Sequence, residues 1–376
     1  MKQAPHNRRR FLIETLSGSA AVALGGAAAY AAHAHSRDDY ADVVASTWRH
    51  APSMELPLAQ AQRELVRYAT LSANSHNTQP WHFAIADRSI AVSPDFSRRL
   101  PAVDPDDHHL FASIGCAVEN LMQAASAFGF EAAARFDSGT RDVRVELEPG
   151  ARHRTALFDA IPDRQSTRAD FDGRTVSVDK LRFLEAAGNG DRVRMLLFTE
   201  RKDIDAILSY LITGNSAQLD DDAFVGEFKS WMRFSYSDIL AKRDGLFSKS
   251  SGNPAIPGWL GRMLFSRVFT KEAENKKYVS QMGTSAGVAV FVAERNDPEG
   301  WFEAGRSCQR FALQATALGL HHSFVNQPVE VPAVRGQFAT FLGVGDKRPD
   351  LVMRFGYGAT LPRSLRRSVD DVVMSG

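Results

Sequence analysis

An internal repeat limits the architectures open to this chain more than any other pattern in it. The segments GCAVENLMQAASAFGF (115–130) and GRSCQRFALQATALGL (305–320) align at a constant offset of 190 residues, which takes Gly115 to Gly305 and Gly129 to Gly319. Both carry apolar residues at helical spacing and reach a glycine, as a helix with a left-handed C-terminal residue does. Two amphipathic helices can look alike by chance, but the shared small residues favour duplication. A period near half the chain predicts two fused, subunit-like halves rather than a solenoid.

The two halves carry different polar motifs. In the first half, the uncharged segment ANSHNTQPW (73–81) lies between a helical pattern over 65–71 and a strand-like run over 81–85. Amides donate and accept hydrogen bonds at once, so this segment suits a flat ligand with polar edges, although Asn and Ser also occupy ordinary helix ends and turns. The second half begins instead with DRQSTR (163–168), which has no full counterpart in the first half.

Arginines supply the second kind of motif. Arg164 and Arg168 are spaced i and i+4 around Ser166, a spacing that puts two guanidinium groups on one side of a helical turn; Arg366 and Arg367 add charge from far along the chain. Guanidinium groups match phosphate oxygens in geometry and charge. Each cluster alone is more simply explained as a solvated charged face. Together with the amide segment they indicate a nucleotide-like ligand with a flat ring.

These motifs resemble those of the nitroreductase superfamily of flavin mononucleotide (FMN) enzymes, and most of all its Acg-type branch with two fused halves. The resemblance covers most of the chain from about Leu56 onward. The motifs that carry it are Ser75-x-Asn77-x-Gln79-Pro80-Trp81, Arg164-x-Ser166-x-Arg168, the segment from Trp301-x-x-x-Gly305 to Gly319-Leu320, and Arg354-Phe355-Gly356-Tyr357-Gly358 with Arg366-Arg367 behind it.

The resemblance implies an α+β fold with mixed, mostly antiparallel sheets flanked by helices, in which the two halves form an intrachain pseudo-dimer. It also implies flavin sites between the halves. Because only one such site would combine both motifs, we expect one FMN per chain. Its contacts would come from Asn74, Ser75, Asn77, Arg164, Ser166, Arg168, Ser323, Phe324, Asn326, Arg366 and Arg367.

By the same resemblance, Arg164, Ser166 and Arg366 would hold the phosphate, and Arg168 would lie near N1 and the C2 carbonyl of the ring. The amide segment would bond the ring edges, and 323–326 would pass near N5. A cation near N1 stabilises the negative charge of reduced flavin. No side chain is assigned a catalytic role, because the flavin carries the chemistry.

The implied function is an FMN-dependent oxidoreductase that transfers two electrons through N5 to a small acceptor, with NAD(P)H or a protein as donor. The aromatic-rich stretch over residues 214–280, approximately, departs from the pattern of the family. It could be a lid over the flavin or a second small core. A lid that blocks substrates would leave a non-catalytic, FMN-sequestering protein with a degenerate site. A third reading is a redox partner that passes electrons to another protein.

The N-terminal residues have the pattern of an export signal. Asn7-Arg8-Arg9-Arg10-Phe11-Leu12 is a twin-arginine pattern before a weakly apolar run (16–32), so we expect 1–34 to be a signal that engages the twin-arginine export machinery. The protein would then be periplasmic or extracellular; an N-terminal membrane anchor is the alternative. The remaining chain would divide into halves over 35–150 and 151–376.

Two further partner classes are set aside. The net charge is +1, so nothing suggests a nucleic-acid partner. Asp104-x-Asp106-Asp107-His108-His109 has metal-type side chains. However, consecutive loop positions rarely point together, so we read this run as an acidic turn and helix start and expect no metal site.

Overall fold

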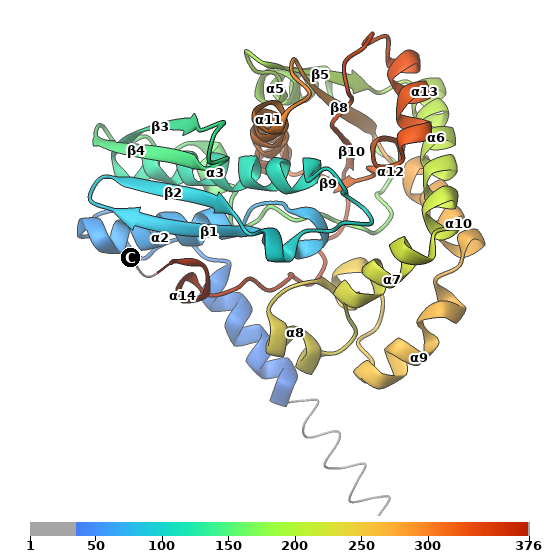
Figure 1. Ribbon diagram of the computed structural model, residues 1–376, viewed down its shortest axis with the longest axis horizontal. Helices are drawn as coiled ribbons and strands as arrows, with labels where there is room; N and C mark the ends of the chain where they lie inside the picture. Colours follow the sequence, from blue (N-terminus) through green and yellow to red (C-terminus); the bar gives the residue numbers. More distant parts are fainter. Residues whose placement is uncertain (1–34, 375–376) are drawn as a thin grey trace, which may run out of the picture.

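The computed structural model describes residues 35–374, so the expected signal segment over 1–34 lies outside the described residues. The chain forms two four-stranded sheets flanked by helices (Figure 1). Every pair of neighbouring strands in the two sheets is antiparallel. The expected α+β class with largely antiparallel sheets is therefore confirmed.

The first sheet has the strand order β1-β2-β4-β3. A helix over 35–47 precedes it in the described chain. The elements of this part are α2 (Leu58–Thr70), η1 (Ser75–Asn77), β1 (Trp81–Ala86), β2 (Ser89–Pro94), η2 (Phe96–Arg98), α3 (His108–Phe128), β3 (Phe130–Phe136), β4 (Val143–Pro149) and α4 (Ala156–Asp159).

The second sheet has the order β5-β8-β10-β9. Its elements are α5 (Val178–Gly188), β5 (Val193–Phe198), β8 (Gly287–Ala293), α11 (Pro298–Ala317), β9 (His321–Phe324), α12 (Gln327–Glu330), α13 (Pro332–Leu342) and β10 (Leu351–Gly356), with α14 (Val369–Val372) near the chain end.

The two sheets share one topology. In each, two strands are followed by a long helix, α3 or α11, and then by two more strands that return in the same spatial order. The difference lies between the first two strands. A tight turn at 87–88 joins β1 to β2, whereas 199–286 separate β5 from β8.

This intervening stretch, which we call the insertion, includes the range of about 214–280 in which the sequence indicated a lid or a second small core. It contains α6 (Arg201–Leu219), α7 (Asp222–Trp231), β6 (Met232–Arg233), α8 (Tyr236–Lys242), β7 (Leu246–Phe247), η3 (Ser248–Ser251), α9 (Gly258–Val268) and α10 (Lys271–Gly283).

The helices at the centre of the molecule touch through their glycines. A Cβ on Gly115 of α3 would lie 2.0 Å from the carbonyl oxygen of Phe302, and a Cβ on Gly305 of α11 would lie 2.0 Å from that of Ala112. The offset of 190 residues that relates the two glycines also relates Ala112 to Phe302. The contact is thus reciprocal, as in a two-fold interface between like subunits.

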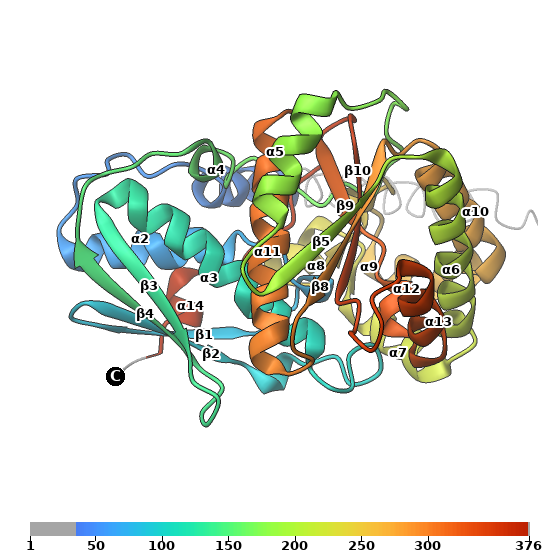
Figure 2. The same cartoon turned by 90° about the horizontal axis from the view of Figure 1, so that it is seen from above.

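The layers follow from the apolar patterns of the strands. In β4 only alternate residues (Val143, Val145, Leu147) are buried, because α2 and α3 cover one face of the first sheet. All of β8 is buried, because α5 and α11 cover one face of the second sheet and α6, α10, α12 and α13 the other (Figure 2). A strand with alternating apolar residues is typical of a sheet covered on one face, and a continuously apolar strand is typical of a sheet covered on both faces.

The end of the chain returns to the first half. After β10, residues 357–374 run past α2, and Val373 pairs in parallel with Phe83 of β1. The Met374 N–H donates to the Phe83 carbonyl at 2.8 Å. Within residues 35–374, no helix combines the length and apolar character needed to cross a membrane.

Candidate functional site

Two adjoining cavities lie where the first half, the second half and the insertion meet. The larger has a volume of about 500 Å³, within the usual range of small-molecule sites, and the smaller about 60 Å³. The residues that line both are Ala73, Asn74, Arg168, Leu246 and Phe324.

The smaller cavity is basic. The charged residues in its lining are Arg164, Arg168, Arg363 and Arg366, and none of its lining residues is Asp or Glu. Trp48 closes one side, with the guanidinium carbons of Arg363 and Arg366 each 4.9 Å from its ring centroid. We call this lining the arginine cradle.

The end of α2 fixes two of these arginines. Arg366 donates from Nε to the Thr70 carbonyl at 2.6 Å and from Nη2 to the Ser72 carbonyl at 3.1 Å, and Arg164 donates from Nη2 to the Leu71 carbonyl at 3.0 Å. The last carbonyls of a helix have no partner within it and carry partial negative charge. The helix end therefore orients both cations.

Several polar atoms of the cradle are buried without a partner in the described residues: Arg164 Nε and Nη1, Ser166 Oγ and Ser250 Oγ. Burial lowers the pKa of Arg164 to about 10. Burial, with repulsion from Arg164 and Arg363, also lowers the pKa of Arg366 well below its usual value. Buried cations with free donors and no carboxylate call for an anion, because an unpaired buried charge is costly. The donors fit a phosphate group.

The amide segment forms a strained corner above the cradle. His76, Asn77 and Gln79 have φ angles of 47°, 54° and 54°, which residues with a Cβ seldom adopt. Asn77 accepts from Arg366 Nη1 at 2.7 Å and donates to the Gly245 carbonyl at 3.0 Å, while Gln79 donates to the Arg243 carbonyl at 2.8 Å. This corner thus joins the first half to the insertion and to the end of the chain.

The segment from Arg164 to Arg168 is extended, so the helical turn expected there is wrong. It lies along the edge of the second sheet, where Ser166 pairs with His322 and the Thr167 N–H donates to the His322 carbonyl at 2.7 Å. Pairing with an open strand edge overrides a helical preference that rested on spacing alone. Both arginines still line the smaller cavity.

The lining of the larger cavity contains two unlike groups of side chains. One is polar and includes His76, His109, Tyr278, Asn326, Gln327 and Glu330. The other is aromatic, lies wholly in the insertion and includes Phe224, Phe228, Phe234, Phe265 and Phe269. Ring contacts join the two, since His76 meets Phe228 edge-on with 5.4 Å between centroids. Such a space suits a flat, partly apolar ligand.

Most residues predicted from the sequence line these cavities, and two do not. Those in the lining are Asn74, Ser75, Asn77, Arg164, Ser166, Arg168, Phe324, Asn326 and Arg366. Ser323 is buried within β9, and Arg367 lies outside both linings, where it donates to the carbonyls of Gln79 and Asp371. The hydrogen bonds of Asn77 hold Arg366 and the insertion in place.

Several residues of the lining were not predicted from the sequence, above all Trp48, His109, Ser250 and Tyr278. Ser250 belongs to a stretch that reads as a turn, and Tyr278 to an ordinary amphipathic helix. Trp48 has a positional signal, because it precedes α2 as the segment from Arg164 to Arg168 precedes α5. The others have no sequence neighbour that links them to an anion or a ring.

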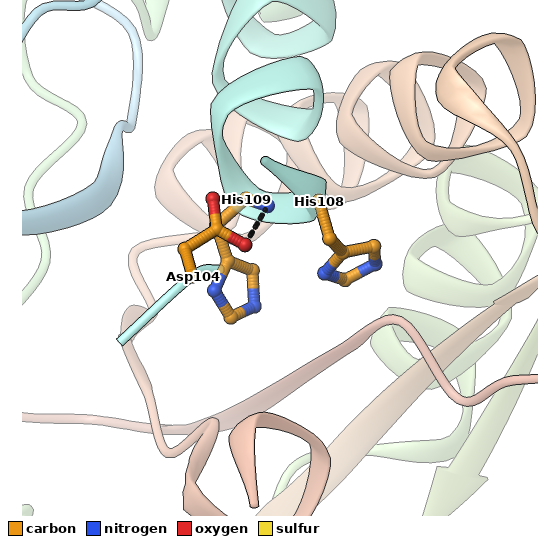
Figure 3. A group of neighbouring side chains, drawn as sticks. All are labelled: Asp104, His108 and His109. Carbon is orange, nitrogen blue, oxygen red and sulfur yellow. Dashed lines mark hydrogen bonds between the residues drawn. The ribbon is translucent and has the colours of Figure 1, made fainter. Parts of the chain in front are cut away.

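One group of metal-type side chains includes His109, which lines the larger cavity. Ligand atoms of Asp104, His108 and His109 lie within 4.8 Å of one another (Figure 3), so the argument that loop neighbours diverge does not hold here. Asp104 accepts from the backbone N–H groups of His109 and Leu110 at 3.0 and 2.9 Å. His108 Nε2 lies 2.9 Å from a carboxylate oxygen of Asp350. These bonds cap the start of α3 and fasten it to Asp350, the residue before β10.

The cap gives a testable expectation. Asp104→Ala should lower the free energy of unfolding by about 2 kcal/mol, because two backbone donors at a buried helix start lose their acceptor. Denaturant unfolding of the purified variant measures the change. The control is Asp106→Ala, which removes a half-exposed carboxylate that pairs with Arg348 and should cost less than about 1 kcal/mol. Equal losses in both variants would contradict the role of Asp104.

Curated relatives confirm the resemblance that the motifs indicated. A putative NAD(P)H nitroreductase of Mycobacterium tuberculosis is 24% identical over 338 residues, which cover 86% of this chain and 94% of the relative. The putative NAD(P)H nitroreductase acg of the same organism is 24% identical over 334 residues, which cover 82% and 94%. No model of a known protein family matches the chain.

Solved structures that resemble this chain correspond to a little over half of it. The FMN-dependent nitroreductase NfnB from Mycobacterium smegmatis, solved with NADPH, has 16% identity and a TM-score of 0.41, covering 59% of this chain and 98% of its own. A nitroreductase with bound FMN from Desulfitobacterium hafniense has 14% identity and a TM-score of 0.37, with the same shares covered.

Proposed function

We propose that this chain is an FMN-dependent oxidoreductase of the nitroreductase type, with one flavin held between the first half, the second half and the end of the chain. One observation carries the proposal: a cradle of buried, partly unpaired arginines opens into a cavity large enough for a ring system. The 24% identical relatives, which carry the name NAD(P)H nitroreductase over nearly their whole length, support the same activity.

The residues fit the two ends of FMN. In this proposal the arginine cradle takes the phosphate, because Arg164 and Ser166 offer free donors there. The ring occupies the part of the larger cavity bordered by Asn74, Ser75 and Phe324. When bound, FMN supplies two-electron transfer through its N5 atom. The protein binds and orients the ring and sets the charge around it.

Arg168 tunes that charge. Its guanidinium lies in the lining of both cavities and has no hydrogen bond or ion pair within residues 35–374. A cation at the ring stabilises the negative charge that the ring gains on reduction. His76 stays neutral beside it, because burial, Arg168 and His109 lower the pKa of His76 to about 3. Arg168 is therefore the cation assigned to the ring.

The visible spectrum of the purified protein tests the proposal. We expect flavin absorbance that bleaches when a reductant is added, and one FMN per chain by absorbance against a protein assay. The reason for a single flavin is that the arginine motif and the amide segment each occur once. A colourless protein that stays empty after incubation with FMN would overturn the assignment, and two flavins per chain would overturn the single site.

The insertion favours a second candidate, an FMN-sequestering protein without turnover. Its aromatic side chains, among them Phe228, Phe265 and Phe269, line the larger cavity, and none of these three lines the cradle. Oxidation of NADH or NADPH with a nitroaromatic or quinone acceptor separates the two. Turnover supports the oxidoreductase, whereas tightly bound flavin with no turnover supports sequestration.

The remaining parts of the proposal rest on the sequence. The twin-arginine pattern supports export of the folded, loaded protein to the periplasm or beyond, with an N-terminal anchor as the alternative. The shared topology and the reciprocal glycine contact support two halves over 35–150 and 151–376 that act as an intrachain pseudo-dimer. The electron donor in this proposal is NAD(P)H or a protein, and the acceptor is a small molecule.

A further inference from the structure

The outer face of α9 is apolar and basic. Trp259 and Met263, one helical turn apart, are 65% and 56% exposed. Arg262 and Arg267 are also exposed beside them. Large apolar side chains this exposed are unusual on one short helix of a globular protein, and they mark a contact surface when they share a face. A tryptophan with flanking arginines is typical of helices that lie in a membrane interface.

Basic charge gathers around this helix although the chain as a whole is nearly neutral. The stretch 242–271 has six Lys or Arg residues and a single acidic one, Asp244. Asp244 is buried and paired with Arg98 and Arg233, so it does not offset the surface charge. Arg262 and Lys271 pair with Asp238 and Asp220, which lie outside the stretch, whereas Lys242, Arg243, Lys249 and Arg267 have no ion pair within residues 35–374. The net charge of the whole chain is only +1. This concentration of cations complements an anionic surface.

The mouth of the larger cavity opens beside the same helix. Most of its lining residues are buried or half-buried, and the exposed ones are Asn253, Pro254 and Val268. Asn253 and Pro254 precede α9, and Val268 ends it and is 64% exposed. A ligand entering the cavity therefore passes along α9.

The described chain also begins at this end of the molecule. Tyr40, in the helix over 35–47, packs with Tyr236 and Phe247 in a cluster that reaches Ala255, three residues before α9. Figure 1 shows this helix, α8 and α9 at the same end of the molecule. The apolar run over 16–32 precedes that helix in the sequence. If the run is retained as an anchor, it holds this end at a bilayer.

We propose that α9 docks on an anionic lipid bilayer through Trp259, Met263, Arg262 and Arg267, so that the cavity mouth faces the membrane and receives apolar, lipid-soluble ligands. The contact does not depend on the proposed flavin chemistry. Protein with and without FMN should bind vesicles equally, so failure of either proposal leaves the other standing.

Vesicle flotation tests the docking. The exported chain should float with phosphatidylcholine vesicles that contain phosphatidylglycerol and much less with phosphatidylcholine alone. Arg262→Gln with Arg267→Gln should weaken binding about 25-fold, at roughly fivefold for each basic residue near the surface. Trp259→Ser with Met263→Ser should abolish it, since the apolar insertion is lost.

A matched control lies on α5, where Val178 and Phe183 are 63% and 57% exposed. Val178→Ser with Phe183→Ser removes comparable apolar surface elsewhere and should leave vesicle binding unchanged. Equal loss in this pair, or binding that survives the α9 changes, would overturn the proposal. The proposal would also be overturned if the protein did not bind vesicles but formed a dimer that the α9 substitutions dissociate. The outer face of α9 would then join two copies of this chain.

Discussion

Arg164→Ala should reduce the affinity for FMN by about 100-fold or more and leave the affinity for riboflavin nearly unchanged. The side chain is buried, and its Nε and Nη1 groups have no partner among the described residues. Each charge-assisted hydrogen bond to a phosphate contributes about 1.5–3 kcal/mol, and two such bonds correspond to about a hundredfold or more in affinity. Riboflavin lacks the phosphate and so loses nothing. Titration of apoprotein, followed by flavin fluorescence, measures both.

Arg168→Ala is the matched comparison. We assign Arg168 to the ring, so its loss should weaken FMN and riboflavin to a similar extent and lower the reduction potential of bound flavin. The two variants thus separate phosphate binding from ring binding without relying on enzyme activity. If Arg164→Ala weakened both ligands equally, or neither, the cradle would not be the phosphate site. Circular dichroism of each variant checks that it folds.

Gly305→Ala should destabilise the protein by about 3 kcal/mol or more, with the full-length chain recovered largely insoluble. Alanine normally stabilises a helix relative to glycine by up to about 1 kcal/mol. Here the added methyl group would lie 2.0 Å from the Ala112 carbonyl oxygen, inside the van der Waals contact, so α3 and α11 must separate. Overpacking a rigid core costs about 1–3 kcal/mol, and a clash with backbone leaves little room for relaxation. Gly115→Ala should behave alike, because the contact is reciprocal.

The control for this prediction is Gly336→Ala. Gly336 is exposed within α13, and a Cβ there would meet nothing within 4 Å. The substitution should therefore be neutral or stabilise the protein by up to about 1 kcal/mol. The soluble yield, together with thermal unfolding of the soluble fraction, compares the three variants. A Gly305→Ala protein as stable as wild type would mean that the helices do not touch where the glycines meet.

The internal repeat predicted the framework of the fold well, because the repeated glycines are required where two helices pack closely. Gly115 and Gly305 recur at one offset since each must admit the backbone of the other helix, and no larger residue satisfies that. The strand-like run at 81–85 also corresponds to β1. Strands with a local periodicity and helix contacts that require glycine can therefore be predicted from a single sequence.

The candidate site was harder to predict because its parts come from distant segments. Residues 164–168 are extended by pairing with β9, which spacing within the segment cannot reveal. Ser250 and Tyr278 reach the cavities only because the insertion folds over them. Asn77 carries a motif of the resemblance, yet its side chain is engaged with Arg366 and Gly245. Sequence identified the chemistry of the site, and tertiary contacts decided which atoms take part.

The return of the chain end to the first half sets an order in time for the biogenesis of this protein. Arg366 reaches the end of α2 and Asn77 only through the final stretch of polypeptide, which Val373 ties down beside β1. A nascent chain whose residues 363–374 have not yet emerged therefore lacks one side of its anion site, whatever its first half has already folded. Ligand capture has to wait until these residues are in place, and a stop codon before them would release a chain with both sheets and no closed cradle.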